Sequence, residues 1–353
     1  MQYKNVANIK KLYRGKQNLP PQNLPYLDKL AQLGPGDLIK NEQTPAKSEV
    51  DASFKLLRKR QIKKYINAKI LIPLINLHNI REKHYKLAYT CFNGIYQDGY
   101  TLKNAGYYCN SRVCLICNNI RTAKYINKYY DTLQEYQDLH FITLTVPAVN
   151  GDVLRDTIGD MYRKFTLIRY KIKRKDKLIG LRKLECNYNI EKNWYNPHYH
   201  LIVQGKHIAA RIRDEWLRLY PNAVKSAQDI QEVEDEYTEF NEKSLLELFK
   251  YMTKLWVSKN GKINFYPAYA IDTIIEAMWG KRIFVAYGLG KQVSENVNTE
   301  EYKMVIDKYR NDIWEWSKDM VNWVSIQYGD TLLPYDSGAK VLKKYQNKIE
   351  ILK

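Results

Sequence analysis

Two histidines placed two residues apart indicate a metal site. His198 and His200 fall in the run Trp194–Val203, which otherwise has the composition of a β-strand. Side chains alternate along a strand, so both imidazoles point to one face, about 6–7 Å apart. Pro197 cannot donate to a sheet ladder, so we expect the strand to begin there. A structural role for two hydrogen-bonded histidines is the alternative interpretation.

A second strand pattern just upstream offers a third ligand. Residues 180–188 have the composition of a strand, and a turn at Asn193 leads into the histidine strand, which predicts a hairpin. In such a hairpin Glu185 comes close to the histidine pair, whereas Cys186 faces the other side with its apolar neighbours. Two imidazoles and one carboxylate can hold a divalent cation. We therefore predict that Glu185 completes the site.

Four of the five cysteines form a second candidate metal site. Cys109, Cys114 and Cys117 are closely spaced, and Cys91 lies 18 positions before Cys109. Four thiolates are the tetrahedral set that zinc prefers, and the alternative is four buried, unliganded thiols. A helix over about 118–137 follows the cluster. Three basic residues are expected on its polar side, in contact with DNA phosphates: Arg121, Lys124 and Lys128.

The composition favours a nucleic-acid partner. Lys and Arg number 57 against 38 Asp and Glu, a net charge of +19, and 30 Tyr and 7 Trp accompany them. Such a mixture suits phosphate contacts and base stacking, although an AT-rich genome would also raise the Tyr count. Further DNA-contacting residues are expected at the end of an amphipathic helix over 152–172: Arg169, Lys171, Lys173, Arg174 and Lys175.

The apolar runs are too short for a membrane protein. None approaches the roughly 18 residues that a bilayer requires, and the N-terminus has no apolar signal core. We therefore expect a cytoplasmic protein without a membrane partner.

A helix predicted over about 245–258 brings together groups suited to nucleophilic catalysis. At about 100° per residue, Glu247, Tyr251 and Lys254 fall on the side opposite the apolar residues. Tyr251 is then a candidate nucleophile, with Glu247 as its neighbouring acid and Lys254 or Lys250 lowering the phenol pKa or holding a phosphate. A surface tyrosine in a ladder of charged residues is the alternative.

These motifs together resemble the HUH endonucleases, and within them the rolling-circle replication initiators of small bacterial plasmids. The resemblance is carried by Phe141–Val146, Asn196–Val203 and Glu247–Lys254, in that order. Three further segments are similar to accompanying segments of that family: residues 180–188, residues 280–284 with Gly288 and Leu289, and the cysteine segment 109–117. The resemblance covers about 90–290.

The resemblance implies a fold, a reaction and partners. The fold is α+β, a central antiparallel sheet flanked by helices (a ferredoxin-like palm), with a zinc knuckle and helical extensions. The reaction is nicking of single-stranded or hairpin DNA at a replication origin, with Mg²⁺ or Mn²⁺ on His198, His200 and Glu185, structural Zn²⁺ on the cysteines, and Tyr251 as nucleophile. Glu247 would activate water for the terminating cleavage. A host helicase and polymerase are the further partners implied.

The expected domain organisation follows the order of the motifs. It comprises a Pro-rich arm (1–50), a basic helical segment (51–88), the cysteine knuckle with its helix (89–135), the nicking domain (136–292) and a helical extension (293–353). Two other functions fit the same motifs. One is an HUH transposase, and the other is a non-catalytic zinc-containing DNA-binding protein.

Overall fold

The computed structural model describes most of the chain from residue 47 onward. The described residues are 47–98, 101–104, 108–233, 248, 255–259, 262–290, 294, 296–297, 313–326, 328–334, 336–346 and 349–351. The predicted Pro-rich arm therefore lies almost wholly outside the described residues. None of the described helices has the length and apolarity needed to cross a membrane.

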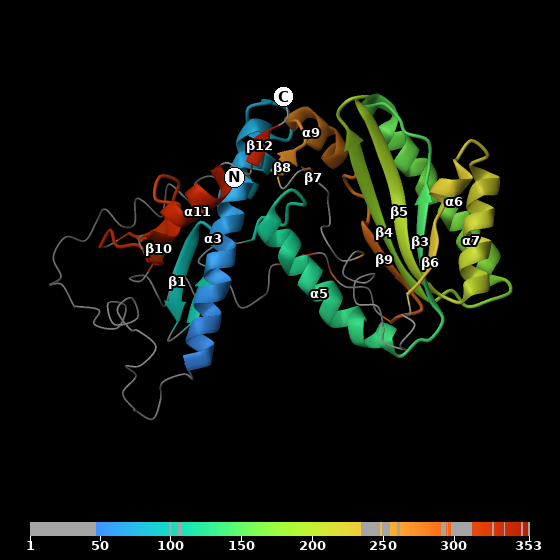
Figure 1. Cartoon of the computed structure of the whole chain (residues 1–353), viewed down its shortest axis with the longest axis horizontal. Helices are drawn as coiled ribbons and strands as arrows, with labels where there is room; N and C mark the ends of the chain where they lie inside the picture. The colour runs from blue at the N-terminus through green and yellow to red at the C-terminus, as the bar shows by residue number, and fades with distance from the viewer. Residues whose placement is uncertain are drawn as a thin grey trace. The chain divides into compact units, whose positions relative to one another are not determined.

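A five-stranded antiparallel sheet carries the predicted histidine strand (Figure 1). The strand order is β6-β3-β5-β4-β9, and every neighbouring pair is antiparallel. The strands are β3 (Leu139–Thr145), β4 (Gly180–Asn189), β5 (Trp194–Gln204), β6 (Ile230–Glu232) and β9 (Phe284–Tyr287). The predicted hairpin is the β4–β5 pair, and Asn193 in its turn has a positive φ of 52°. The expected α+β fold with a central antiparallel sheet is thus confirmed.

The histidine strand is longer than predicted. β5 begins at Trp194, and Pro197 lies inside it, opposite Cys186 of β4. The β3 ladder ends where Thr145 pairs with His198, so Pro197 lies just beyond the last residue that β3 pairs with. Because no β3 residue faces Pro197, its missing N–H removes no ladder bond to β3.

Two helices cover one face of this sheet, as Figure 1 shows: α6 (Leu154–Lys173) and α7 (Lys206–Leu219). The apolar positions of α6 that recur every three or four residues are all buried: Leu154, Ile158, Met161, Phe165, Ile168 and Ile172. The Tyr199 ring of β5 lies 5.6 Å from Phe165 and 5.7 Å from Trp216 of α7. α9 (Ala268–Ala277) also contacts α6. Tyr199 and its same-side neighbours therefore form the core, and the histidines lie on the opposite face.

A helix also reaches the histidine face at the β9 edge. Tyr125 of α5 (Leu115–Gln134) stacks on Phe284 at 4.5 Å, and Phe284 pairs in register with Lys183 of β4. The buried side of α5 differs from the predicted one. It carries Asn118, Arg121, Tyr125, Tyr129 and Leu133, so Arg121, which was expected on the polar side, lies among the buried residues.

A second sheet combines segments from the two ends of the described chain. Its order is β11-β10-β1-β2, where β1 is Gly94–Asp98, β2 is Thr101–Asn104, β10 is Ile313–Ser317 and β11 is Asn322–Ser325. Gln61 of α3 (Lys47–Ile75) donates to the Val321 carbonyl at 2.7 Å and to Ser337 at 3.0 Å in α11 (Asp336–Gln346). The C-terminal segment was expected to be largely helical. Its described part, however, includes the strands β10 and β11. Their tryptophan-rich composition favours strands.

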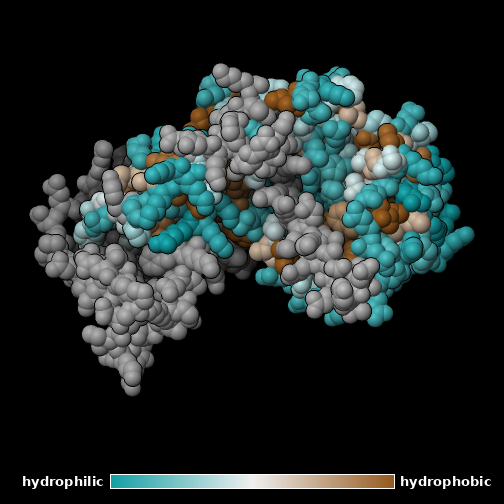
Figure 2. All heavy atoms as spheres, in the orientation of Figure 1, coloured by the Kyte–Doolittle hydropathy of each residue, from teal (hydrophilic) through white to brown (hydrophobic). Residues whose placement is uncertain are grey.

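A small third sheet has the order β12-β8-β7, with β7 at Trp256–Lys259, β8 at Lys262–Phe265 and β12 at Ile349–Ile351. The helix predicted over 245–258 is wrong at its end, because residues 256–258 pair with β8 as part of strand β7. Of the rest of that segment, only residues 248 and 255 are described. The remaining short elements are α4 (Glu82–Tyr89) and the 3₁₀ turns η1 (Gly151–Val153) and η2 (Lys225–Ala227). The visible surface of the described residues is mostly hydrophilic, with small separate apolar patches (Figure 2).

Candidate active site and metal centres

The β4–β5 hairpin brings the three predicted ligands together. Glu185 pairs directly with His198, and Lys183 pairs with His200, so all four side chains share one face. One ligand atom from each of Glu185, His198 and His200 lies within 4.8 Å of the others. The constant register of the hairpin thus assembles the group from two adjacent strands without any loop.

The two imidazoles are oriented for a shared ligand. His198 Nδ1 is 2.9 Å from the Asn196 carbonyl, and His200 Nδ1 is 3.2 Å from the Thr143 hydroxyl. A carbonyl can only accept, so His198 carries its proton on Nδ1 and directs its Nε2 lone pair toward His200. The two Nε2 atoms lie 3.1 Å apart. Both can therefore lie about 2.1 Å from one cation, at an angle of about 95°, which suits an octahedral ion.

Glu185 is ionised in this arrangement. Lys183 is 1% exposed and donates to Glu185 Oε2 at 2.8 Å. Burial opposes ionisation of this carboxyl, but the charge of Lys183 and the adjacent histidines outweigh burial and lower the pKa of Glu185 to about 2. The lysine engages one carboxylate oxygen and leaves the other to a cation. The donor set of two imidazoles and one carboxylate therefore fits a divalent metal.

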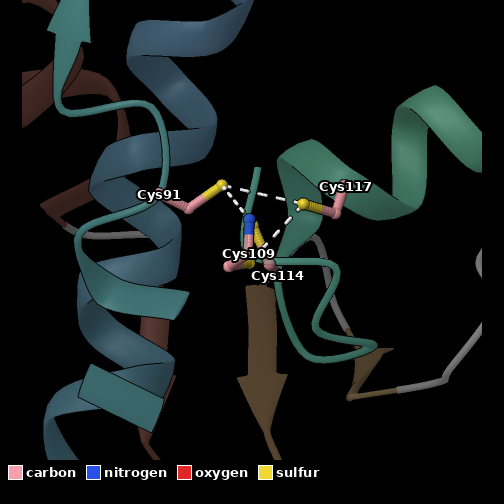
Figure 3. A group of neighbouring side chains, drawn as sticks. All are labelled: Cys91, Cys109, Cys114 and Cys117. Atoms are coloured by element: carbon pink, nitrogen blue, oxygen red, sulfur yellow. Dashed lines mark hydrogen bonds between the residues drawn. The ribbon is translucent and has the colours of Figure 1, made fainter. Parts of the chain in front are cut away.

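The four clustered cysteines converge as predicted (Figure 3). All four are buried, and their sulfurs lie within 4.8 Å of one another. Cys117 Sγ is 3.6 Å from Cys91 Sγ and 3.5 Å from Cys109 Sγ. A zinc ion with Zn–S bonds of about 2.3 Å requires tetrahedral S···S distances of about 3.8 Å. The cluster, including the irregularly spaced Cys91, is thus compatible with a zinc knuckle.

Neighbouring groups hold the cysteine sulfurs in place. The backbone N–H of Ser111 donates to Cys109 Sγ at 3.4 Å, and Asn67 of α3 donates to Cys114 Sγ at 3.5 Å. The Asn67 side-chain oxygen also accepts from the Leu115 N–H at 2.9 Å, at the start of α5. Lys64 is buried beside the cluster and donates to the Cys91 carbonyl at 2.9 Å. Burial lowers the pKa of Lys64 to about 8, although the cysteine charges oppose that shift.

The basic residues predicted to contact DNA differ in exposure. Arg121 is only 2% exposed and donates to the backbone carbonyls of Asn110 and Ser111 in the cysteine loop. It therefore supports the knuckle, and its side chain is not on the same surface as the exposed Lys128. Lys124 is half-buried and donates to the Asn296 carbonyl at 2.8 Å.

The second basic group lies at the end of α6. Arg169 is half-buried over the Tyr287 ring, and Lys171 pairs with Glu215 at 2.9 Å. Three others are exposed: Lys173, Arg174 and Lys175. The candidate nucleophile Tyr251 and its neighbours Glu247, Lys250 and Lys254 lie outside the described residues.

Several groups that were not predicted from the sequence also lie at these sites. Lys183 lies two residues before Glu185, so the alternation of side chains along a strand is enough to place both on one face. Thr143 reaches His200 only through the β3–β5 pairing. A third set, Asp138, His140 and Glu232, also gathers within 4.8 Å. Glu232 joins it through the β3–β6 pairing, for which the sequence has no local signal.

Comparison with known proteins identifies the family. Residues 101–328 match the family described as "Replication protein". The chain is 30% identical over 146 residues to "Protein rep" of Streptococcus pneumoniae, covering 36% of this chain and 45% of that protein. It is 31% identical over 163 residues to "Protein rep" of Staphylococcus aureus, a match that covers 41% of this chain and 69% of that protein. It is 26% identical over 223 residues to "Protein rep" of a Bacillus species, which covers 54% of this chain and 72% of that protein. No solved structure matches this chain.

The fold is the one expected of a plasmid rolling-circle initiator, and the family match covers more than half of the chain. The chain belongs to the replication-protein family, so the resemblance described from the sequence is confirmed. The matched region spans less than half of the Streptococcus relative and about 70% of the other two.

Proposed function

We propose that this protein starts rolling-circle replication of a plasmid by nicking single-stranded DNA at the origin. The observation that carries the proposal is the convergence of Glu185, His198 and His200 on one sheet face, with ligand atoms within 4.8 Å. The family match and the net charge of +19 support a DNA substrate. The zinc knuckle is proposed to brace α5.

The proposed reaction is a transesterification. The phenolate oxygen of Tyr251 attacks the scissile phosphorus, and the bond from phosphorus to the 3′ oxygen breaks. The 3′ oxygen takes the bonding electrons and a proton, which gives a free 3′-OH and a 5′-phosphotyrosine. The 3′-OH then primes synthesis. Lys250 or Lys254 is proposed to stabilise the phenolate, and Glu247 to activate the water of the terminating cleavage.

The described residues supply the other half of the site. A bound Mg²⁺ or Mn²⁺ would act as a Lewis acid that polarises the phosphate. His198 and His200 are held for it by the Asn196 carbonyl and the Thr143 hydroxyl. Lys183 keeps the Glu185 carboxylate ionised and fixed in place. These are the positioning tasks that phosphoryl-transfer chemistry requires, because most of its catalysis is orientation and charge stabilisation.

A nicking assay tests the proposal. Single-stranded DNA from the plasmid origin is incubated with protein and Mn²⁺, and the products are resolved under denaturing conditions with and without protease. We expect a covalent protein–DNA adduct and a fragment ending in 3′-OH, both lost in Tyr251→Phe. Binding without cleavage by the wild-type protein would instead support the non-catalytic DNA-binding alternative. Rejoining of mobile-element ends without nicking of the origin would support the transposase.

A further inference from the structure

The face that carries the metal ligands continues to the end of the hairpin. The β4–β5 register is constant from the pair Gly180–Val203 to the pair Asn189–Trp194, so no bulge interrupts the alternation. Trp194 therefore shares the face of His198 and His200. Four residues of strand place Trp194 about 13 Å from His198 along β5.

Trp194 has the exposure of a binding residue. Its side chain is 44% exposed, although tryptophan is among the residues that gain most from burial. The ammonium of Lys192, in the hairpin turn, lies 6.0 Å from the centre of its ring. An accessible aromatic face beside a cation is the combination that binds single-stranded DNA, because the ring stacks on a base while the cation contacts the backbone.

Two paired asparagines lie between the tryptophan and the metal ligands on this face. Asn187 of β4 pairs with Asn196 of β5, on the same face. The side-chain oxygen of Asn187 is buried and has no hydrogen-bond partner among the described residues. A buried acceptor left without a donor destabilises the folded protein. The Asn187 residue itself is only half-buried, so rotation of its amide can bring this oxygen to the surface. There an exocyclic amino group of a base is a donor that would satisfy it.

We propose that the hairpin face forms a subsite for the single strand next to the scissile phosphate. In it, Trp194 stacks on one unpaired base and the Asn187 side-chain oxygen accepts a hydrogen bond from the amino group of another. This inference rests on the proposed function, because it places the strand across the face that carries Glu185, His198 and His200. The ligand is an unpaired base, which a duplex would not present.

Equilibrium binding without metal tests the stacking step. Two probes of about 20 nucleotides are compared in EDTA: oligothymidylate, and an abasic strand with the same backbone. Stacking on one base contributes about 1–3 kcal/mol, so Trp194→Ala should weaken oligothymidylate binding by about 5- to 150-fold. It should leave the abasic strand unaffected, and Trp194→Phe should retain most of the affinity.

A matched control variant tests whether the effect is specific to Trp194 or follows from the loss of any exposed tryptophan. Trp279→Ala removes a tryptophan of similar exposure, 49%, whose ring packs against His84 and which lies outside the β4–β5 hairpin. It should bind both probes as the wild type does. Equal weakening by the two tryptophan variants, or equal weakening of both probes by Trp194→Ala, would overturn the proposal.

The hydrogen bond proposed for the Asn187 side-chain oxygen is tested by a separate measurement. Cytosine carries an amino donor where thymine carries an oxygen acceptor. The ratio of oligocytidylate to oligothymidylate affinity should therefore fall in Asn187→Ala, with Mn²⁺ binding unchanged as a check on the hairpin. An unchanged ratio would refute the role of Asn187. None of these measurements requires nicking, so a failed subsite and a failed nicking reaction are distinguishable.

Discussion

Glu185 and His198 occupy directly paired positions on two adjacent antiparallel strands, so a carboxylate and an imidazole meet on one face with no loop between them. A site built on paired strands is held more rigidly than one built on loops. The strand β3 adds a hydroxyl to the same face, since Thr143 pairs with His200. The positions of the candidate ligands are therefore determined by backbone register, and the groups around them can be tested one at a time.

The Thr143 hydroxyl should orient His200 for metal binding. Loss of a hydrogen-bond partner behind a ligating histidine typically costs about 10–100-fold in metal affinity. We expect Thr143→Val to weaken Mn²⁺ binding by that factor, measured by calorimetry or electron paramagnetic resonance. Excess Mn²⁺ should restore nicking. Thr145→Val is the control, because Thr145 lies on the same strand and face but bonds to Gln228. Similar affinities in the two variants would contradict this role of Thr143.

The cysteine cluster should bind one zinc and hold the β1–β10 sheet. Trp316 N–H donates to Asn93 at 2.8 Å and the Trp323 indole to Phe92 at 3.2 Å, directly after Cys91. We expect Cys114→Ser to lose zinc and to expose the segment around 91–130 to proteolysis, because metal binding is coupled to folding. Cys186→Ser should keep full zinc stoichiometry, since Cys186 lies outside the cluster. Purified wild-type protein without zinc would refute the assignment.

Substitution of Arg121 should affect stability and substitution of Lys128 should affect DNA binding, although both residues belong to α5. Arg121→Ala leaves loop carbonyls without their charged donor, so we expect a loss of about 1.5–3 kcal/mol in stability and weaker zinc retention. Lys128→Ala should leave stability unchanged and lower DNA affinity at low salt. With roughly 5–8 phosphates neutralised, the log–log salt slope for single-stranded DNA should be about −3.5 to −5.5, and Lys128→Ala should reduce its magnitude by about 0.7. A wild-type slope near zero would contradict this interpretation of the charge.

Asp272 of α9 should make stability depend on pH. Arg81 Nε donates to it at 2.7 Å, Asn79 at 2.8 Å, and the Tyr85 hydroxyl also donates to it. Although partial burial opposes ionisation, these bonds lower the pKa of Asp272. Its stabilisation is therefore complete above the ordinary aspartate pKa of about 3.9 and is lost as pH falls through the lower folded value.

Asp272→Asn should destabilise the protein by about 2–4 kcal/mol at neutral pH. In this variant the free energy of unfolding should also fall less steeply than in the wild type as the pH drops below about 4. Urea unfolding across that range measures both effects. Asp214→Asn is the control, because Asp214 is exposed and pairs only with its neighbour Arg213 among the described residues. Parallel pH profiles for the wild type and Asp272→Asn would show that this carboxylate is not the group responsible.

The sequence predicted the parts of this protein whose signals are local. The β4–β5 hairpin and the buried side of α6 follow from alternation and helical periodicity over short windows. The pairing of β1 with β10 joins Gly94 to Glu315, and such long-range pairing leaves no periodic pattern in either segment. Arg121 was placed on a polar surface because its type is basic. The loop carbonyls that bury it become visible only in the folded chain.

The separate tasks of Tyr251 and Glu247 provide the last prediction. Tyr251→Phe removes only the nucleophilic oxygen, so DNA binding should survive while the nick and the covalent adduct disappear. The Glu247 carboxylate is not needed for the phenolate to attack. Glu247→Ala should therefore still form the first nick and the phosphotyrosine. If it activates water, the terminating cleavage should slow by about 10²–10⁴-fold, and the adduct should accumulate.

Two origin oligonucleotides allow the initiating and terminating cleavages to be timed separately. Glu247→Gln is the informative companion, because it keeps the size of the side chain but cannot accept a proton from water as a carboxylate does. Both Glu247 variants should show normal initiation and slow termination. A carboxylate that only pairs with Lys254 or Tyr251 would affect both cleavages equally or neither. Equal losses in the two steps would therefore refute Glu247 as the terminating base, while leaving Tyr251 as the nucleophile.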